Sequence, residues 1–155
     1  MLAVASLTRV HLFPRAAQTL VREMAAHHAS DRRMEEKAWL LFGRFRNDVA
    51  IIKAVGSPKC DASPGHVMVD HADAIRLALE MRRQDRSLTI IGMMHTHTDG
   101  SDEPSFMDLL GDRQWIDGRA DKRGVFGIGT PDGHICWFGL TADTPHYYGL
   151  SVGVE

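Results

Sequence analysis

The chain has 155 residues, 44% of them hydrophobic, and its 18 Lys and Arg face 20 Asp and Glu for a formal net charge of −2. This length and composition indicate one globular domain over residues 1–155 and exclude a disordered chain. The nearly balanced charge argues against a nucleic-acid-binding surface. No stretch approaches the ~18 apolar residues that cross a membrane. Because the N-terminal positive charges follow the apolar residues, we expect no signal peptide and a cytoplasmic protein.

The cysteine and histidine content narrows the classes of site that the chain can build. Cys60 and Cys136 are too few for a disulfide framework or a four-thiolate zinc site, and we expect both to be free thiols. Of the nine histidines, His95 and His97 form a single H-x-H. The remaining histidines are interpreted as solvated or capping residues.

The first half of the chain predicts strands and helices in alternation. Residues 7–12 alternate between apolar and polar, as in a short strand, and apolar residues at helical spacing follow Pro14, with the helix ending in the polar run 27–33. Apolar runs over 35–45 and 46–56 predict two antiparallel strands. Further predicted elements are a loop over 57–66, which has two prolines and a glycine, and a helix over 71–84 with Asp70 as its N-cap.

The second half begins with a continuous apolar run over 88–95, which is typical of a buried central strand and places His95 at its carboxyl end. We predict a short helix over 105–110 after the following loop. Residues 124–130 and 134–140 predict two strands joined by a turn over 130–133. The tail over 141–155 is expected to add a final edge strand. Strands alternating with helices indicate an α/β domain with one mixed sheet flanked by helices.

Four residues after the central strand form a pattern with metal chemistry. His95 and His97 are two residues apart, so both imidazoles point to the same side of the backbone. Ser105 and Asp108 are three residues apart, so they share one face of a helix. Two histidines and one carboxylate leave a fourth position for water, which is the arrangement of a catalytic zinc site.

The full pattern, H95-T-H97-T-D-G-S-D-E-P-S105-F-M-D108, resembles the H-x-H-x7-S-x2-D motif of the JAMM (MPN+ or JAB) metalloproteases. A second signature of that family, a glutamate seven residues before a glycine that ends an apolar strand, matches Glu36 and Gly43. Glu35 is the reserve for this role, since alternation points the two glutamates to opposite faces. The resemblance covers roughly residues 8–140 and implies the JAB/MPN fold, which is cytidine-deaminase-like.

The resemblance also implies roles for these residues. His95, His97 and Asp108 would hold one Zn²⁺ per chain, with a zinc-bound water as nucleophile. Glu36 would act as general acid and base, and Ser105 would stabilise the oxyanion. All five residues are retained, which favours an active enzyme over the scaffold members of the family.

The chain departs from the usual family pattern at two positions. Thr98 replaces a proline that often follows the second histidine, and Trp39 stands where a glycine is common. Trp39 either narrows a substrate groove or packs in the core. Trp115 is the other expected substrate contact, and the segments 57–66 and 111–123 are the expected flanks of the groove.

By resemblance, the substrate is a ubiquitin-like protein of a bacterial or archaeal cell. Its flexible C-terminal tail would lie beside an edge strand, and the enzyme would cleave after it, in deconjugation or in precursor processing. E1-like and E2-like proteins of the same operon are the expected further partners. The alternatives are a hydrolase that releases an adduct from a sulfur-carrier protein and a non-catalytic MPN-type partner-binding module.

Two other metal-dependent classes fit the sequence less well. The run H-T-H-T-D-G-S-D is similar to the first motif of PHP-type phosphoesterases, but Glu103 stands where that motif has glycine, and too little chain follows to complete their barrel. Zinc deaminases need H-x-E and P-C-x2-C, and the chain has neither.

Overall fold

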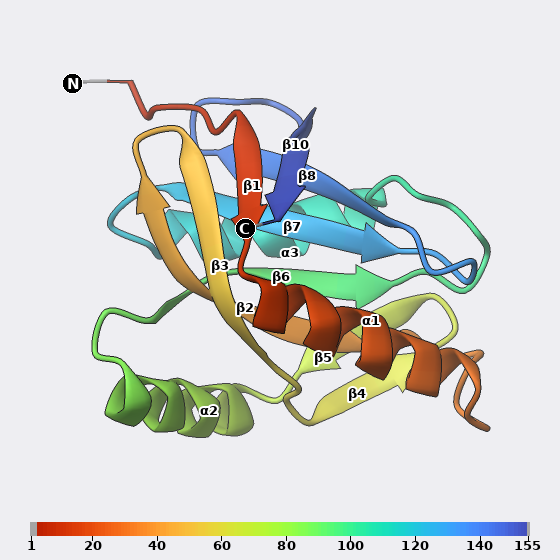
Figure 1. Cartoon of the computed structure of the whole chain (residues 1–155). Helices are drawn as coiled ribbons and strands as arrows, with labels where there is room; N and C mark the ends of the chain where they lie inside the picture. Colours follow the sequence, from red (N-terminus) through yellow and green to blue (C-terminus); the bar gives the residue numbers. More distant parts are fainter. Residues whose placement is uncertain (1–2, 155) are drawn as a thin grey trace.

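The computed structural model describes residues 3–154. They form one eight-stranded mixed sheet in the order β10-β1-β3-β2-β6-β7-β8-β9, a two-stranded sheet of β4 and β5, and three helices (Figure 1). The strands are β1 (Arg9–Leu12), β2 (Ala38–Arg46), β3 (Val49–Gly56), β4 (Cys60–Ser63), β5 (His66–Val69), β6 (Thr89–Thr96), β7 (Arg123–Gly129), β8 (Ile135–Thr141), β9 (Tyr148–Gly149) and β10 (Ser151–Val154). The helices are α1 (Pro14–His28), α2 (His71–Gln84) and α3 (Phe106–Asp117).

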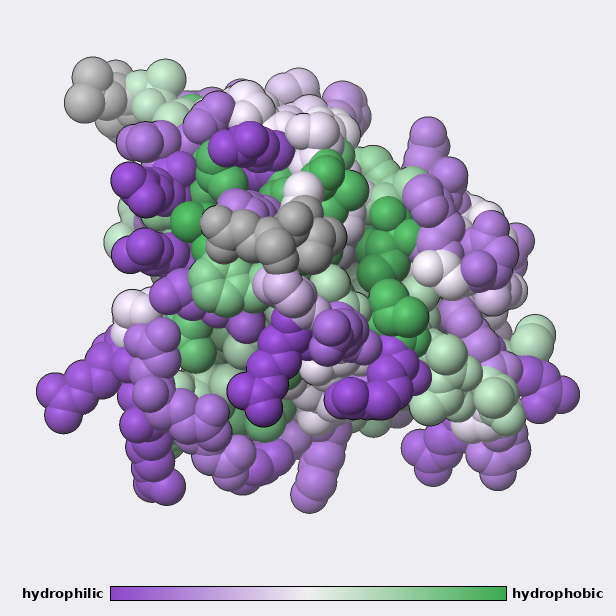
Figure 2. All heavy atoms as spheres, viewed as in Figure 1, coloured by the Kyte–Doolittle hydropathy of each residue, from purple (hydrophilic) through white to green (hydrophobic). Residues whose placement is uncertain are grey.

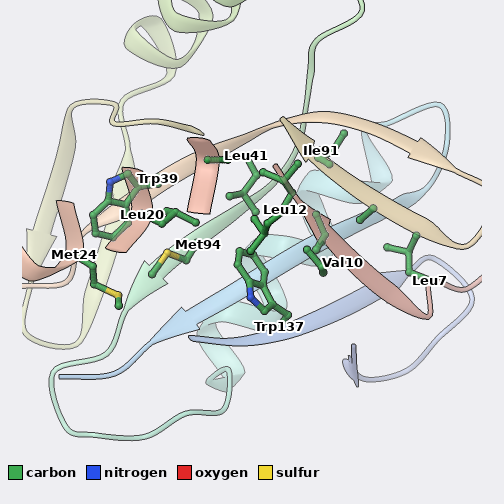
Figure 3. Packing of buried hydrophobic residues seen from close by; sticks show 14 residues of the cluster. Leu7, Val10, Leu12, Leu20, Met24, Trp39, Leu41, Ile91, Met94 and Trp137 are labelled. Atoms are coloured by element: carbon green, nitrogen blue, oxygen red, sulfur yellow. The ribbon is translucent and has the colours of Figure 1, made fainter. Parts of the chain in front are cut away.

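The principal core lies between α1 and the sheet (Figure 3). Helix α1 begins with Pro14, whose fixed φ suits the first helical position, and buries Ala16, Leu20 and Met24. These side chains pack against two fully or nearly buried indoles, Trp39 of β2 and Trp137 of β8. The core therefore joins α1 to strands from both halves of the sheet.

The opposite face of the sheet is covered by the other two helices, and Figure 1 shows α3 behind the sheet when α1 is in front. Leu77 of α2 packs with Leu40 and Phe42 of β2, while Ile116 of α3 packs with Phe126 and Leu140. Side chains of neighbouring positions on β2 enter different cores, as the period of a strand requires. Both faces of the central strands are thus buried.

The structure confirms the predicted mixed sheet flanked by helices, with two corrections. The predicted loop over 57–66 contains β4 and the start of β5, because Pro64 and Gly65 make a turn between two short strands whose burial alternates. Helix α3 continues beyond Leu110 to Asp117. Helix α1 ends at His28, within the polar run 27–33 where its end was predicted.

The outer surfaces are largely polar on the side of α1. Figure 2 shows mostly hydrophilic atoms on this face, with apolar atoms confined to smaller areas between them. Within residues 3–154, none of the helices combines the length and the apolar character needed to cross a membrane.

Strand β6 packs against β7 at a position that tolerates only glycine. A Cβ atom on Gly92 would lie 1.6 Å from the carbonyl oxygen of Val125, a backbone atom that cannot move aside cheaply. The close approach of these two strands therefore depends on the missing side chain.

We predict that Gly92→Ala lowers the free energy of unfolding by about 2 kcal/mol or more, because the strands must separate. Gly111→Ala is the matched control: nothing lies within 4 Å of a Cβ there, and alanine in an exposed helix should add about 0.5–1 kcal/mol. Urea denaturation of both variants measures the difference. Equal stability of the two variants would contradict the prediction.

Candidate metal centre

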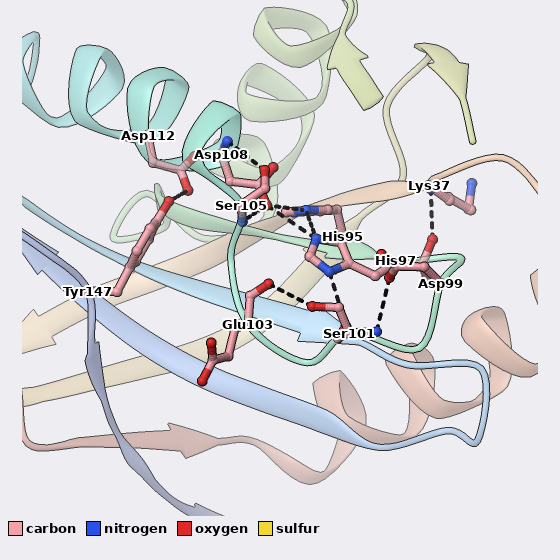
Figure 4. A network of polar contacts seen from close by, with 11 residues as sticks. Lys37, His95, His97, Asp99, Ser101, Glu103, Ser105, Asp108, Asp112 and Tyr147 are labelled. Carbon is pink, nitrogen blue, oxygen red and sulfur yellow. Dashed lines mark hydrogen bonds and ion pairs between the residues drawn. The ribbon is translucent and has the colours of Figure 1, made fainter. Parts of the chain in front are cut away.

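The two histidines lie where β6 leaves the sheet (Figure 4). His95 is the second-last residue of β6 and pairs with Ala38 on one side and Ile128 on the other. The backbone N–H of His97 donates to the carbonyl of Gly129 at 2.9 Å, which continues the contact with β7 beyond the end of the strand. The ring centroids of His95 and His97 are 4.9 Å apart, so the two imidazoles lie next to each other at the carboxyl end of β6.

Helix α3 presents the third residue of the cluster through its own N-terminal cap. The hydroxyl of Ser105 accepts the Asp108 N–H at 3.1 Å, and the Ser105 N–H donates to Asp108 Oδ2 at 2.8 Å. This reciprocal pair satisfies two free backbone donors of the first turn. It also fixes Asp108 with one carboxylate oxygen towards the histidines.

The three predicted ligand atoms form a nearly equilateral triangle. His95 Nε2 and His97 Nε2 are 3.1 Å apart, and Asp108 Oδ2 lies 3.3 Å from the first and 3.2 Å from the second. Ligand atoms at 2.0–2.1 Å from a tetrahedral zinc ion are roughly 3.3–3.4 Å from one another. The donor set and its spacing therefore fit zinc, with one coordination position left open.

The other ring nitrogen of His97 has a partner that sets its tautomer. His97 Nδ1 lies 3.0 Å from the carbonyl oxygen of Ser101, so Nδ1 carries the proton and donates, while Nε2 keeps its lone pair for a metal. Burial lowers the pKa of His97, but the hydrogen bond and the charge of Asp108 outweigh it and raise the pKa above its ordinary value.

Asp108 stays ionised in the cluster. Burial alone would raise the pKa of its carboxyl, but the hydrogen bonds to His95 and His97 and the N–H of Ser105 hold that pKa far below its ordinary value. An ionised carboxylate is the form that ligates a cation.

Glu36 is the glutamate that the structure brings to the histidines. One of its carboxylate oxygens belongs to a group of ligand atoms that, with a nitrogen of His95 and of His97, all lie within 4.8 Å of one another. Its N–H donates to the carbonyl of Ser63 at 2.9 Å, and the residue is 7% exposed. Burial raises the pKa of Glu36, and His95 and His97 partly offset that rise. Glu35 has no place in this group.

Asp108 is better placed than Glu36 to be the third ligand. Among residues 3–154, the ion-pair contacts to the two imidazoles, at 3.2 and 3.3 Å, are made by Asp108. The Glu36 carboxylate lies next to this cluster, within 4.8 Å of a nitrogen of each histidine.

The hairpin of β4 and β5 is tied to both sides of the cluster. The Glu36 N–H donates to the carbonyl of Ser63. The Thr98 hydroxyl donates to the carbonyl of Pro64 at 2.7 Å. Proline at position 98 would have no hydroxyl to donate, so the departure from the usual family residue has a structural use here.

The two tryptophans predicted to touch substrate are in different environments. Trp39 is 0% exposed and packs in the core under α1, so it offers no surface to a substrate. Trp115 is half-buried between Phe126 and the guanidinium of Arg119, 4.7 Å above its ring. The exposed apolar side chains near the cluster are instead Phe106, Met107 and Leu110 on α3.

One further acidic residue lies close to the cluster and was not among the predicted site residues. Asp112 is one helical turn after Asp108, is 7% exposed, and accepts a hydrogen bond of 2.6 Å from the hydroxyl of Tyr147 (Figure 4). Burial raises the pKa of Asp112 to about 7, although the bond from Tyr147 opposes the rise. Its spacing from Asp108 is a signal that the sequence contained.

Comparisons with known proteins place most of this chain in one family. A family model described as prokaryotic homologs of the JAB domain matches residues 17–143. The solution structure of protein DSY2949 from Desulfitobacterium hafniense has a TM-score of 0.62 and 20% identity, and the match covers 94% of this chain and 92% of that one. At this identity the likeness concerns the fold alone. No curated protein sequence matches.

We predict that the buried carboxyl of Asp112 makes the zinc-free protein less stable as the pH rises. Its pKa is raised from 3.8 to about 7 on folding, so its contribution to stability is fully present below about pH 4 and is lost as the pH approaches 7. The stability of Asp112→Asn relative to the wild type should therefore improve by about 1–4 kcal/mol between pH 4 and pH 8.

Urea denaturation at both pH values, in the presence of a chelator, measures this change. Asp117→Asn, at an exposed position of the same helix, is the control and should show no such change. An Asp112→Asn difference that is the same at pH 4 and pH 8 would disprove the shift.

Proposed function

The chain belongs to the prokaryotic JAB-domain family, and from this premise we propose that it is a zinc metallopeptidase that cleaves after the C-terminal tail of a ubiquitin-like protein. One observation carries the proposal: His95, His97 and Asp108 bring three ligand atoms within 3.1–3.3 Å of one another, next to the buried Glu36. Because the family includes inactive members, membership alone does not support catalysis, and the proposal depends on this site.

His95, His97 and Asp108 would hold the zinc ion through two imidazoles and one carboxylate. When bound, zinc supplies a Lewis acid that lowers the pKa of a water molecule towards neutrality and polarises a carbonyl group. The hydrogen bond between His97 Nδ1 and Ser101 keeps that imidazole in the tautomer that binds metal.

Glu36 would move the proton. Its pKa is raised by burial, and a carboxyl whose pKa lies nearer to neutrality both accepts and releases a proton readily. It would take a proton from the attacking water and give it to the leaving amine. This matches the general acid and base role that the family pattern implies.

Ser105 would stabilise the oxyanion. Its oxygen accepts the Asp108 N–H in the helix cap, which uses a lone pair and leaves the hydroxyl hydrogen available to donate. Ser105 is exposed, so a substrate carbonyl can reach it. A donor that is fixed before the reaction stabilises developing negative charge at little cost in reorganisation.

Two features next to the site support a protein as substrate. Phe106, Met107 and Leu110 are 71%, 61% and 49% exposed on α3, directly after Ser105. The β4–β5 hairpin stands on the other side, beside Glu36, and short strands of this kind can pair with an extended tail. We propose that a ubiquitin-like protein binds across these features. A sulfur-carrier protein is the alternative substrate, and E1-like and E2-like proteins of the same operon are the further partners that we propose.

We predict about one zinc ion per chain in protein purified without chelators, and loss of that zinc in Asp108→Ala, because two imidazoles alone bind zinc weakly. Mass spectrometry of metal content measures it. Asp117→Ala, the exposed carboxylate at the end of the same helix, should keep its zinc. Zinc retained by Asp108→Ala would contradict the ligand assignment, and two or more metal ions per chain would favour a phosphoesterase.

We predict that Glu36→Ala keeps its zinc and its fold but loses about 10²–10⁴-fold in kcat, because the residue moves protons and is not a ligand. Glu35→Ala is the matched control and should stay within about threefold of wild type, a change too small for a lost proton-transfer group. The assay is cleavage of reporter fusions at the tails of bacterial ubiquitin-like and sulfur-carrier proteins.

Activity retained by Glu36→Ala would remove its catalytic role, and loss of zinc from that variant would make it a ligand instead. If wild-type protein holds zinc but cleaves none of the fusions, a non-catalytic MPN-type module becomes the better interpretation.

A further inference from the structure

Asp112 is a buried carboxyl that has no part in the proposed chemistry. It is 7% exposed, and Tyr147 Oη is its hydrogen-bond donor at 2.6 Å. Burying a carboxylate with a single donor is costly unless positive charge lies nearby. The position therefore calls for an explanation that the peptidase motif does not give.

The geometry relates Asp112 to the metal cluster. Asp108 and Asp112 are four residues apart on α3, so their side chains lie on one face of the helix, one above the other. His95 and Asp108 both influence the pKa of the Asp112 carboxyl. Asp112 thus adds a second acidic group to the face of α3 that carries Asp108.

The nearest cation on the helix does not balance this charge by a direct contact. The guanidinium of Arg113 donates to the carbonyls of Thr144 and Pro145 at 2.7 and 2.9 Å. Together with the bond from Tyr147 to Asp112, these contacts hold α3 against the segment before β9. Of the two anchors, only Asp112 also brings negative charge towards the cluster.

We propose that Asp112 is a positioning residue of the metal centre, held by Tyr147, which increases the affinity of the His95, His97 and Asp108 cluster for zinc. The inference rests on the proposed function and extends it to a residue outside the family motif. Its basis is the placement of a buried carboxylate one turn behind a ligand. Residues that support metal ligands from outside the coordination sphere commonly change affinity by about 10–100-fold.

The experiment measures the zinc affinity of Asp112→Asn by competition with a chromogenic chelator. Asparagine keeps the shape and can still accept the hydroxyl of Tyr147, so the variant removes the charge and keeps the anchor. Arg113→Met is the matched control, because it removes the other anchor of the same segment and leaves the charge. Circular dichroism and thermal unfolding of each variant report on the fold separately from zinc binding.

The expected result is a zinc Kd about 10–100-fold higher for Asp112→Asn, while Arg113→Met lowers Tm and stays within about threefold of the wild-type Kd. An unchanged Kd for Asp112→Asn, or an equal weakening in Arg113→Met, would overturn the role of Asp112 and leave the proposed function standing. Failure of the wild type to bind zinc would overturn both.

Discussion

Asp108 Oδ2 accepts the N–H of Ser105 at 2.8 Å and lies 3.2–3.3 Å from the two imidazole nitrogens. The same oxygen therefore belongs to a helix cap and to a candidate metal site. The cap fixes where α3 begins. The same hydrogen bonds therefore determine both the start of this helix and the position of the third ligand. The hydroxyl of Ser105 is placed by the same constraint, because it accepts the N–H of Asp108 in the cap.

The remaining parts of the site depend on the pairing of β2 with β6. Ala38 lies opposite His95 in this antiparallel pair, and beyond it the Lys37 N–H donates to the Thr96 hydroxyl at 2.9 Å. Glu36 follows directly and so comes to lie beside the histidines. Its burial raises its pKa, and its N–H donates to the carbonyl of Ser63 in the β4–β5 hairpin. The sheet thus places the histidines, and the hairpin holds the backbone of Glu36 beside them.

The sequence was sufficient to predict the site residues whose chemistry and spacing are unusual. The pattern of His95, His97, Ser105 and Asp108 predicted a cluster that the structure assembles. The spacing of the second family signature selected Glu36 and kept Glu35 in reserve, and the structure brings Glu36 to the histidines. Both glutamates precede β2, which begins at Ala38, so strand alternation does not apply to them. Trp39 was left open between groove and core, and the core under α1 contains it.

Helix α3 was predicted too short for a physical reason. Amphipathic helices bury apolar residues and expose polar ones, but α3 buries Asp112 and exposes Phe106 and Met107. The sequence of α3 therefore lacks the apolar face that predicts a helix packed on a sheet. The second half of the helix was not predicted, and Asp112, which lies in that half, was missed. The β4–β5 hairpin was missed because its two strands have only four residues each and lie next to Pro58, Pro64 and Gly65, which are typical of a loop.

The C-terminal segment joins opposite edges of the large sheet. β9 pairs with β8 at one edge of the sheet. A single residue, Leu150, separates β9 from β10, which pairs with β1 at the other edge. Without residues 148–154, β1 and β8 would each present an open edge. Open edges pair readily with other chains, so this one short segment protects two strands from intermolecular pairing.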